Sequence, residues 1–105
     1  MYESWWGMTT LPQIEEHSEE CRKYLLSDKD AIVKRWIKNG ASGWRLDVVD
    51  ELPGFFVKEL RENVKKADKD AVIIGEVWED ASNKSAYGER REYFLGKELD
   101  SVMNY

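Results

Sequence analysis

The sequence contains very few of the residues that build disulfide frameworks or metal centres. Its 105 residues include one cysteine, Cys21, and one histidine, His17. A lone cysteine cannot close an internal disulfide, and the two residues offer no spacing typical of a Cys/His metal site. Low cysteine content is typical of a reducing compartment, so we expect a cytoplasmic protein, although exported bacterial enzymes can also lack disulfides.

Long apolar runs and basic clusters are also missing. No stretch approaches the roughly 18 consecutive apolar residues of a membrane span, and the first residues do not follow a signal-peptide pattern. The 16 basic residues are dispersed among 21 acidic ones, and the formal net charge is −5. Because a nucleic-acid-binding surface needs concentrated positive charge, we expect neither a membrane nor a nucleic acid as a partner.

Aromatic residues, in contrast, are abundant, with five tryptophans, five tyrosines and three phenylalanines in a chain that is 42% hydrophobic. This length and apolar content fit one domain with a modest core. Residues 1–17 show neither helical nor strand periodicity and are predicted to form a loop region. Within this loop, Tyr2, Trp5 and Trp6 either bind a ligand or form a hydrophobic cap over the core.

Two short apolar segments, each ending on a carboxylate, organise the rest of the chain. Residues 43–48 (GWRLDV) alternate apolar and polar side chains up to Asp47, and residues 71–77 (AVIIGEV) are largely β-branched up to Glu76. Both are predicted to be strands, with a helix between them. A strand–helix–strand unit has parallel strands that end at the same edge of the sheet. We therefore expect Asp47 and Glu76 to be close neighbours, an arrangement suited to acid/base chemistry.

The helices are predicted from caps and periodicity. A short helix over residues 18–26 has Ser18 as its N-cap, and a second helix follows an Asp28 cap and ends at Asn-Gly, residues 39–40. The helix between the two strands runs from 53 to 66, with Pro53 as its first helical residue. Its buried stripe has helical spacing and consists of Phe56, Leu60 and Val64.

A short helix at about residues 84–95 and a third strand over residues 99–105 complete the predicted order. The strands are all expected to be parallel, which is the α/β class. Parallel sheets are normally covered on both faces and avoid bare edges. A sheet of only three strands leaves its edges exposed, so we expect the chain to form a homo-oligomer through them.

Four motifs in order resemble the α-amylase family of glycoside hydrolases. Residues 43–48 contain the pattern G-x-R-x-D and resemble the strand-four motif of that family, and residues 75–78 (GEVW) resemble its strand-five motif. Residues 10–14 (TLPQI) are similar to a loop segment of the neopullulanase, cyclomaltodextrinase and maltogenic-amylase branch. Residues 100–105 (DSVMNY) are similar to the sixth strand of that branch. Together the four motifs extend the resemblance over essentially the whole chain.

The resemblance implies an α/β fold that is part of a (β/α)8 TIM barrel, about strands four to six with the intervening helices. Residues 1–105 would be a fragment of the catalytic barrel, with 1–17 as the loop region before it and 18–105 as the βα units. A closed barrel needs eight strands and roughly 250 residues. We therefore expect the chain to be cut from something larger, and the isolated chain to be inactive.

The resemblance also implies roles for individual residues. Asp47 matches the nucleophile, Glu76 the general acid/base, and Arg45 the residue that keeps the nucleophile ionised. A retaining mechanism needs such a carboxyl pair about 5–5.5 Å apart, with one member ionised and the other protonated. Arg45 shares a strand face with Asp47 and favours its charged form, whereas the apolar sequence neighbours of Glu76 favour its neutral form.

The implied substrates are α-glucans, namely maltodextrin, cyclodextrin or pullulan, cut at α-1,4 bonds with α-1,6 bonds as a further candidate. We expect Glu51 to bind the substrate together with three tryptophans, Trp5, Trp6 and Trp78; rim packing is the alternative for Trp78. The sequence departs from the family pattern at Glu79, where this branch often has a histidine. Asp50 and Glu51 stand where typical α-amylases have Lys-His. The loss of that histidine removes one support for the usual calcium site, so we predict no metal and no cofactor.

Two alternatives from other classes stay open. The first is a non-catalytic α/β module that binds carbohydrate or a protein partner through its exposed aromatic residues. The second is a metal-dependent barrel enzyme with Asp47, Glu76 and Asp100 as ligands, which the early position of Asp100 in its strand disfavours. Without the flanking motifs, Arg45 and Asp47 would be interpreted as a structural ion pair.

Overall fold

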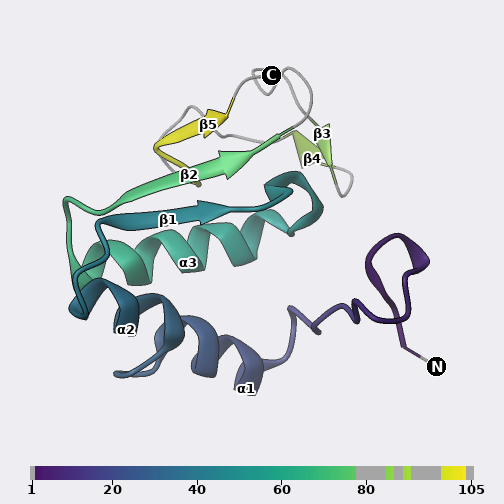
Figure 1. Cartoon of the computed structure of the whole chain (residues 1–105), viewed down its shortest axis with the longest axis horizontal. Coiled ribbons are helices and arrows are strands. Elements are labelled where there is room, and N and C mark those ends of the chain that lie inside the picture. Colours follow the sequence, from purple (N-terminus) through teal and green to yellow (C-terminus); the bar gives the residue numbers. More distant parts are fainter. Residues whose placement is uncertain (1, 78–84, 87–88, 91–97, 104–105) are drawn as a thin grey trace.

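The fold is a three-stranded parallel sheet with helices packed against one face (Figure 1). The computed structural model describes residues 2–77, 85–86, 89–90 and 98–103. The strands of the sheet, in the order β1–β2–β5, are β1 (Gly43–Leu46), β2 (Val72–Glu76) and β5 (Ser101–Met103). The helices are α1 (Glu19–Arg22), which continues as a π-helical segment (Lys23–Ser27), α2 (Ile32–Lys38) and α3 (Gly54–Ala67). 3₁₀ turns occur at Trp5–Gly7 and Val49–Glu51.

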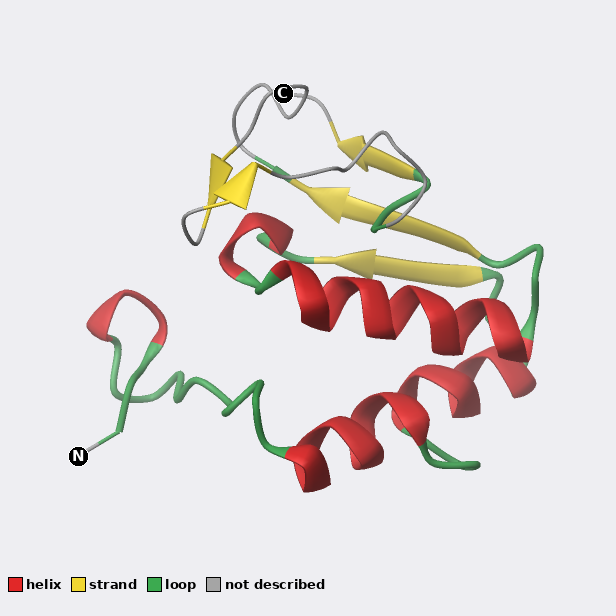
Figure 2. Cartoon of the chain, turned by 180° about the vertical axis from the view of Figure 1, so that it is seen from behind, coloured by secondary structure: helices red, strands yellow, loops and turns green. Residues whose placement is uncertain are grey.

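The predicted strand–helix–strand unit is confirmed. β1 and β2 are parallel, with Leu46 opposite Gly75, and β2 and β5 are parallel, with Glu76 opposite Met103. Figure 2 shows all three strands pointing the same way above α3, with α1 and α2 further from the sheet. The C-terminal ends of the strands therefore share one edge, which is the edge where Asp47 and Glu76 lie.

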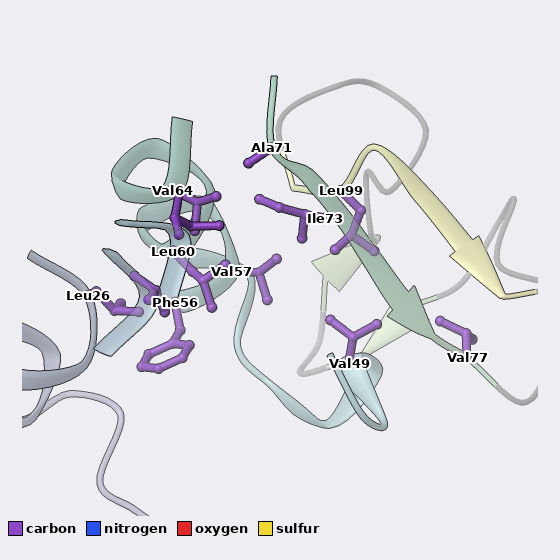
Figure 3. Close-up of a cluster of buried hydrophobic side chains, with 12 residues drawn as sticks. Leu26, Val49, Phe56, Val57, Leu60, Val64, Ala71, Ile73, Val77 and Leu99 are labelled. Carbon is purple, nitrogen blue, oxygen red and sulfur yellow. The ribbon is translucent and has the colours of Figure 1, made fainter. Parts of the chain in front are cut away.

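The core lies between α3 and the sheet. The predicted stripe on α3 is confirmed, because Phe56, Leu60 and Val64 are all buried. Figure 3 shows Val57 and Val64 of α3 on the side of Ile73 of β2, whereas Phe56 lies on the side of Leu26 from the N-terminal helical segment. Fully burying a side chain of this kind contributes roughly 1.5–3 kcal/mol. The helical period therefore specifies which face of α3 supports the sheet.

The boundaries of three elements differ from the prediction. β1 ends at Leu46 instead of Val48, because Val48 has the left-handed backbone conformation (φ 44°) that breaks an extended strand. β2 is one residue shorter at each end than predicted. Pro53 is the N-cap of α3 rather than its first helical residue.

One predicted cap is confirmed and one is wrong. The Ser18 hydroxyl oxygen accepts a hydrogen bond from the amide of Cys21, as expected of an N-cap. Asp28 does not cap α2, whose N-cap is Ala31. The backbone amide of Asp28 donates to the Lys23 carbonyl at the end of the π-helical segment, and its carbonyl accepts the amide of Ala31 in a turn. A turn placed between the predicted cap and the helix moves the start of α2 along the chain.

The predicted helix at about 84–95 is wrong where the structure describes that segment. There, β3 (Ser85–Ala86) pairs with β4 (Glu89–Arg90) in an antiparallel hairpin; the rest of the range lies outside the described residues. The predicted third strand is confirmed as β5, although residues 104–105 also lie outside them. Within the described ranges, every helix is too short or too polar to cross a membrane.

Candidate active site

The two strand-end carboxylates meet as the sequence predicted. Asp47 follows β1 directly, and Glu76 is the last residue of β2. Because the register places Leu46 opposite Gly75, the next residue of each strand also lies side by side. Side chains at these positions project from the sheet face opposite α3, since they alternate with the core-facing Ile73 and Leu46.

Arg45 joins the two carboxylates. Its Nη1 donates a hydrogen bond to Oδ1 of Asp47, and its Nη2 lies 3.0 Å from Oε1 of Glu76. Its Nε donates to the Met103 sulfur across the sheet at 3.4 Å. Both carboxylates thus lie within the span of one planar guanidinium. The sequence predicted the contact with Asp47, whereas the contacts with Glu76 and Met103 depend on the register of three strands and were missed.

The two carboxylates have different surroundings. The side chain of Asp47 is 73% exposed and that of Glu76 only 10%. The second oxygen of Glu76 accepts a hydrogen bond from the backbone amide of Val48 at 3.1 Å. Burial of Glu76 agrees with the predicted setting, but its contacts with a cation and an amide show that the setting is not purely apolar. Different surroundings give two carboxyl groups in one site different proton affinities, so that each can have a different chemical role.

A cleft of about 490 Å³ opens beside Asp47. One wall comes from the turn after β1, with Val48, Glu51 and Leu52. The N-terminal loop supplies the other wall, with Trp5, Thr10, Leu11, Pro12, Gln13, Ile14 and Glu16. This volume lies within the roughly 300–1,000 Å³ of small-molecule sites. The cleft therefore brings a mostly apolar wall next to the exposed carboxylate.

Of the tryptophans predicted to bind substrate, Trp5 lines this cleft and Trp6 lies against Trp5. Trp5 and Trp6 are stacked, with ring centroids 5.0 Å apart. The indole Nε1 of Trp6 donates a hydrogen bond of 2.8 Å to Oε1 of Glu51, which attaches the N-terminal loop to the turn after β1. The structure thus gathers Trp5, Trp6 and Glu51 in one place. Trp78 lies outside the described residues.

Residues 3–105 match the family model "Alpha amylase, catalytic domain". The chain belongs to the α-amylase family. The resemblance found in the sequence motifs is thereby confirmed.

Relatives in the α-amylase family support this assignment along nearly the whole chain. The chain is 40% identical over 96 residues to a cyclomaltodextrinase of Thermoanaerobacter pseudethanolicus and 36% identical over 95 residues to neopullulanase 2 of Thermoactinomyces vulgaris. Each alignment covers 90% of this chain and 14% of the relative, so the chain spans about one seventh of their length. A solved debranching enzyme of Nostoc punctiforme superposes with a TM-score of 0.77 at 36% identity, covering 98% of this chain and 19% of its own.

The structural neighbours in the family are TIM-barrel enzymes, which confirms the predicted α/β barrel class. In such barrels the active site lies at the C-terminal ends of the strands. Asp47, Glu76 and Arg45 lie at that end of the sheet. The match to the family and the position of the carboxylates therefore point to the same edge.

Asp100 does not belong to this site. It precedes β5, whereas Met103 at the other end of that strand is the residue opposite Glu76. Its carboxylate accepts hydrogen bonds from Arg61 and Lys65, both at 2.8 Å, and from the amide of Ile73 at 2.9 Å. The alternative in which Asp100 binds a metal together with Asp47 and Glu76 is therefore wrong. Within the described ranges, no group of three or more potential metal-ligating side chains comes together.

Burial and hydrogen bonding act on Asp100 in opposite directions. Burial alone raises the pKa of its carboxyl group, but the hydrogen bonds from Lys65, Arg61 and the Ile73 amide outweigh burial and lower the pKa from 3.8 to about 2. Asp100 is consequently ionised at neutral pH. It ties the start of β5 to α3 at the edge of the sheet opposite the candidate site.

Proposed function

We propose that this chain supplies the nucleophile and the general acid/base of a retaining glycoside hydrolase that acts on α-glucans. The observation that carries the proposal is the single guanidinium of Arg45 in contact with both Asp47 and Glu76. A shared cation keeps the two carboxyl groups close together, as the retaining mechanism requires. The names of the relatives, cyclomaltodextrinase and neopullulanase, support cyclodextrin, maltodextrin and pullulan as substrates, with α-1,4 and α-1,6 bonds as targets.

The proposed reaction has two steps. The carboxylate of Asp47 attacks the anomeric carbon while Glu76 donates its proton to the departing glycosidic oxygen, which leaves a glycosyl ester on Asp47. Glu76, now ionised, accepts a proton from a water molecule that attacks the same carbon and releases the sugar. Arg45 holds both groups throughout and stabilises the negative charge on whichever carboxylate is ionised.

The N-terminal loop is proposed to bind the substrate. Trp6 is 66% exposed, and its indole Nε1 donates to Glu51, which lines the cleft. Trp5 lies beside it and lines the cleft next to Asp47. Aromatic faces bury large apolar areas at low entropic cost, which suits the apolar face of a glucose unit. Trp78 and a cytoplasmic location stay predictions from the sequence.

The 105-residue chain by itself is proposed to be inactive. Its described residues form three parallel strands, and a closed barrel needs eight. Reacting groups lose much of their effect when displaced by about 1 Å. Incubating the purified chain with cyclodextrin or maltotriose tests this directly: any hydrolysis that Asp47→Asn abolishes would show that the chain is active alone.

A chimera tests the catalytic roles. Residues 3–105 would replace the matched segment of the Thermoanaerobacter cyclomaltodextrinase, and the product would be assayed on cyclodextrin. We expect Asp47→Asn and Glu76→Gln each to lower kcat about 10³-fold or more. Glu59→Gln is the matched control, because Glu59 pairs with Arg22 at a helix surface and should change kcat little. Proton NMR of the first product should show the α anomer; a β anomer or unchanged kcat in either variant contradicts the proposal.

A second candidate is a non-catalytic module that binds carbohydrate or a protein partner. The stacked pair of half-buried Trp5 and exposed Trp6 favours it, since such a surface can bind sugar without chemistry. Tryptophan fluorescence of the chain titrated with maltodextrin separates the two functions. Binding that persists in Asp47→Asn and Glu76→Gln, together with a chimera that has no activity, would support the module.

A further inference from the structure

Val48, the residue after the proposed nucleophile, has a strained backbone. Its φ of 44° and ψ of 52° lie in the left-handed region. For a β-branched residue this conformation is a genuine outlier, because the branched side chain crowds the backbone. Such a conformation persists only where the surrounding structure holds it, and strained residues of this kind cluster at functional sites.

Two contacts hold the turn at Val48. Its backbone amide donates a hydrogen bond of 3.1 Å to Oε2 of Glu76. The next residue, Val49, is fully buried and packs against β2 at Gly75 (Figure 3). A Cβ at Gly75 would lie 2.6 Å from Cγ1 of Val49 and 2.6 Å from Cδ1 of Leu99, so only glycine leaves room for this packing.

The two oxygens of Glu76 therefore have separate tasks. Oε1 contacts Arg45, which also holds Asp47, and Oε2 holds the turn that follows Asp47. Asp47 is thus fixed on both sides along the chain, by Arg45 before it and by the turn at Val48 after it. Glu76 contacts both of the groups that fix Asp47, namely the Arg45 guanidinium and the Val48 amide.

We propose that Val48 is a positioning residue. Its left-handed turn, closed by Glu76 and seated by Val49 against Gly75, sets the direction of the Asp47 carboxylate relative to the proton donor. The hydrogen bond to Glu76 and the packing of Val49 keep the turn closed against the preference of a β-branched residue for extended backbone. The protein gives up stability at Val48 in exchange for a defined geometry. The catalytic meaning of the turn rests on the function proposed above, whereas the strain and the contacts do not.

The strain is tested on the 105-residue chain with two matched substitutions. Glycine adopts the left-handed conformation without steric cost, so Val48→Gly should unfold at the same urea concentration as the wild type or a higher one. Val72→Gly is the control, because Val72 is an exposed valine in the regular strand β2 and glycine weakens strands. The urea concentration at the unfolding midpoint should be lower for Val72→Gly than for the wild type. Equal losses in both variants would overturn the claim of strain.

The link between the turn and Glu76 has a spectroscopic signature. In an Asp47→Asn background, where the neighbouring carboxyl group no longer titrates, the amide resonance of Val48 should shift with pH as Glu76 ionises, because that amide donates to the carboxylate. The pH-dependent shift should vanish in Glu76→Gln and weaken in Val48→Gly, while Val72→Gly retains it. A Val48 amide resonance that does not change when Glu76 ionises would overturn the link.

The catalytic consequence is measured in the chimera. Val48→Gly should lower kcat about 10- to 100-fold, since glycine gives the backbone after Asp47 more conformations and the alignment of Asp47 is lost. KM should rise less than about five-fold, because Val48 is only one of the side chains that line the cleft. Val72→Gly should leave kcat within about two-fold. Full kcat in Val48→Gly would overturn the positioning role. If no version of the chimera has activity, the proposed function fails, whereas the urea and NMR results still decide whether Glu76 holds a strained turn.

Discussion

At the scale of single residues, the side chain of Arg45 contacts residues in or next to all three strands of the sheet. Each of its nitrogens has a different partner: Asp47 after β1, Glu76 in β2 and Met103 in β5. A thioether is a weak, neutral acceptor. Met103 therefore orients the third nitrogen without drawing positive charge away from the two carboxylates.

Substitutions of Met103 test this interpretation. Met103→Leu retains the volume and loses only the weak acceptor, so kcat of the chimera should change less than about ten-fold. Met103→Glu places a second anion against the guanidinium and pulls it from Asp47 and Glu76, so kcat should fall at least about ten-fold further. Steady-state kinetics on cyclodextrin measures both. Equal kcat values in the two variants would show that the charge at this position is irrelevant.

The bond between Trp6 and Glu51 joins residues 45 positions apart in the chain. We expect a coupling of about 1 kcal/mol between Trp6→Phe, which removes the donor and retains a ring, and Glu51→Ala. Urea unfolding of both single variants and the double variant of the 105-residue chain gives this value. Trp36→Phe combined with Glu51→Ala is the control and should be additive, because the exposed Trp36 lies on α2. Additivity in the Trp6 cycle as well would contradict a stabilising bond.

At the scale of elements, the two ends of the sheet have different tasks. The C-terminal ends of β1 and β2 carry the candidate site, and the opposite end carries the ion pairs of Asp100 with Arg61 and Lys65 of α3. In TIM barrels the first end hosts function and the second end stability. Asp100 therefore fastens β5 to α3 without taking part in the chemistry.

The pH dependence of stability follows from the lowered pKa of Asp100. A pKa of about 2 in the folded chain, against 3.8 for the free group, means that the folded state favours the carboxylate. Because Asp100 is exposed to solvent, screening reduces this contribution to roughly 1 kcal/mol. It is complete above about pH 4 and is lost as the pH falls toward 2. Asp100→Asn should lower the free energy of unfolding at pH 7 by about that amount and flatten its fall between pH 4 and 2.

Urea unfolding at pH 7, 4 and 2 measures both effects. Asp28→Asn is the matched control, because the described hydrogen bonds of the exposed Asp28 involve its backbone amide and carbonyl, which the substitution retains. The wild type and this control should lose stability in parallel on acidification. An Asp100→Asn curve that runs parallel to them would rule out Asp100 as the source of the acid sensitivity.

At the scale of the whole molecule, the sheet is covered on one side. The helices pack on one face, and in the described part of the chain β1 and β5 each pair with a single strand (Figure 1). The other face carries Val72, which is exposed, and the half-buried Ile74. Open strand edges and uncovered apolar side chains favour association with another chain.

We therefore expect the 105-residue chain to form a dimer or larger assembly. Light scattering over a range of concentrations measures its mass. Ser101→Lys puts a charge on the edge strand β5 and should shift the chain toward the monomer. Ser27→Lys adds the same charge at the end of a helical segment away from the sheet and should not. A monomer at high concentration in the wild type would contradict association through the sheet.

Some features of the chain were readable from local patterns alone. The stripe on α3, the Ser18 cap and the two carboxylates at the ends of neighbouring strands depend on side-chain period and on the rule that parallel strands end together. These are properties of residues close together in the chain. The family assignment likewise came from short motifs, and the match over residues 3–105 confirmed it.

Other features were decided only when distant segments met. Where the structure describes residues 84–95, the β3–β4 hairpin is found instead of the expected helix. Asp28 was expected to cap α2, but a turn follows it and the N-cap is Ala31. The strand expected to reach Val48 stopped at Leu46 because Glu76, 28 residues away, binds the Val48 amide and Gly75 leaves room for Val49. Local residue types thus determined which carboxylates could react, and tertiary contacts decided how they are held, because a strained turn and a shared guanidinium exist only after the strands have paired.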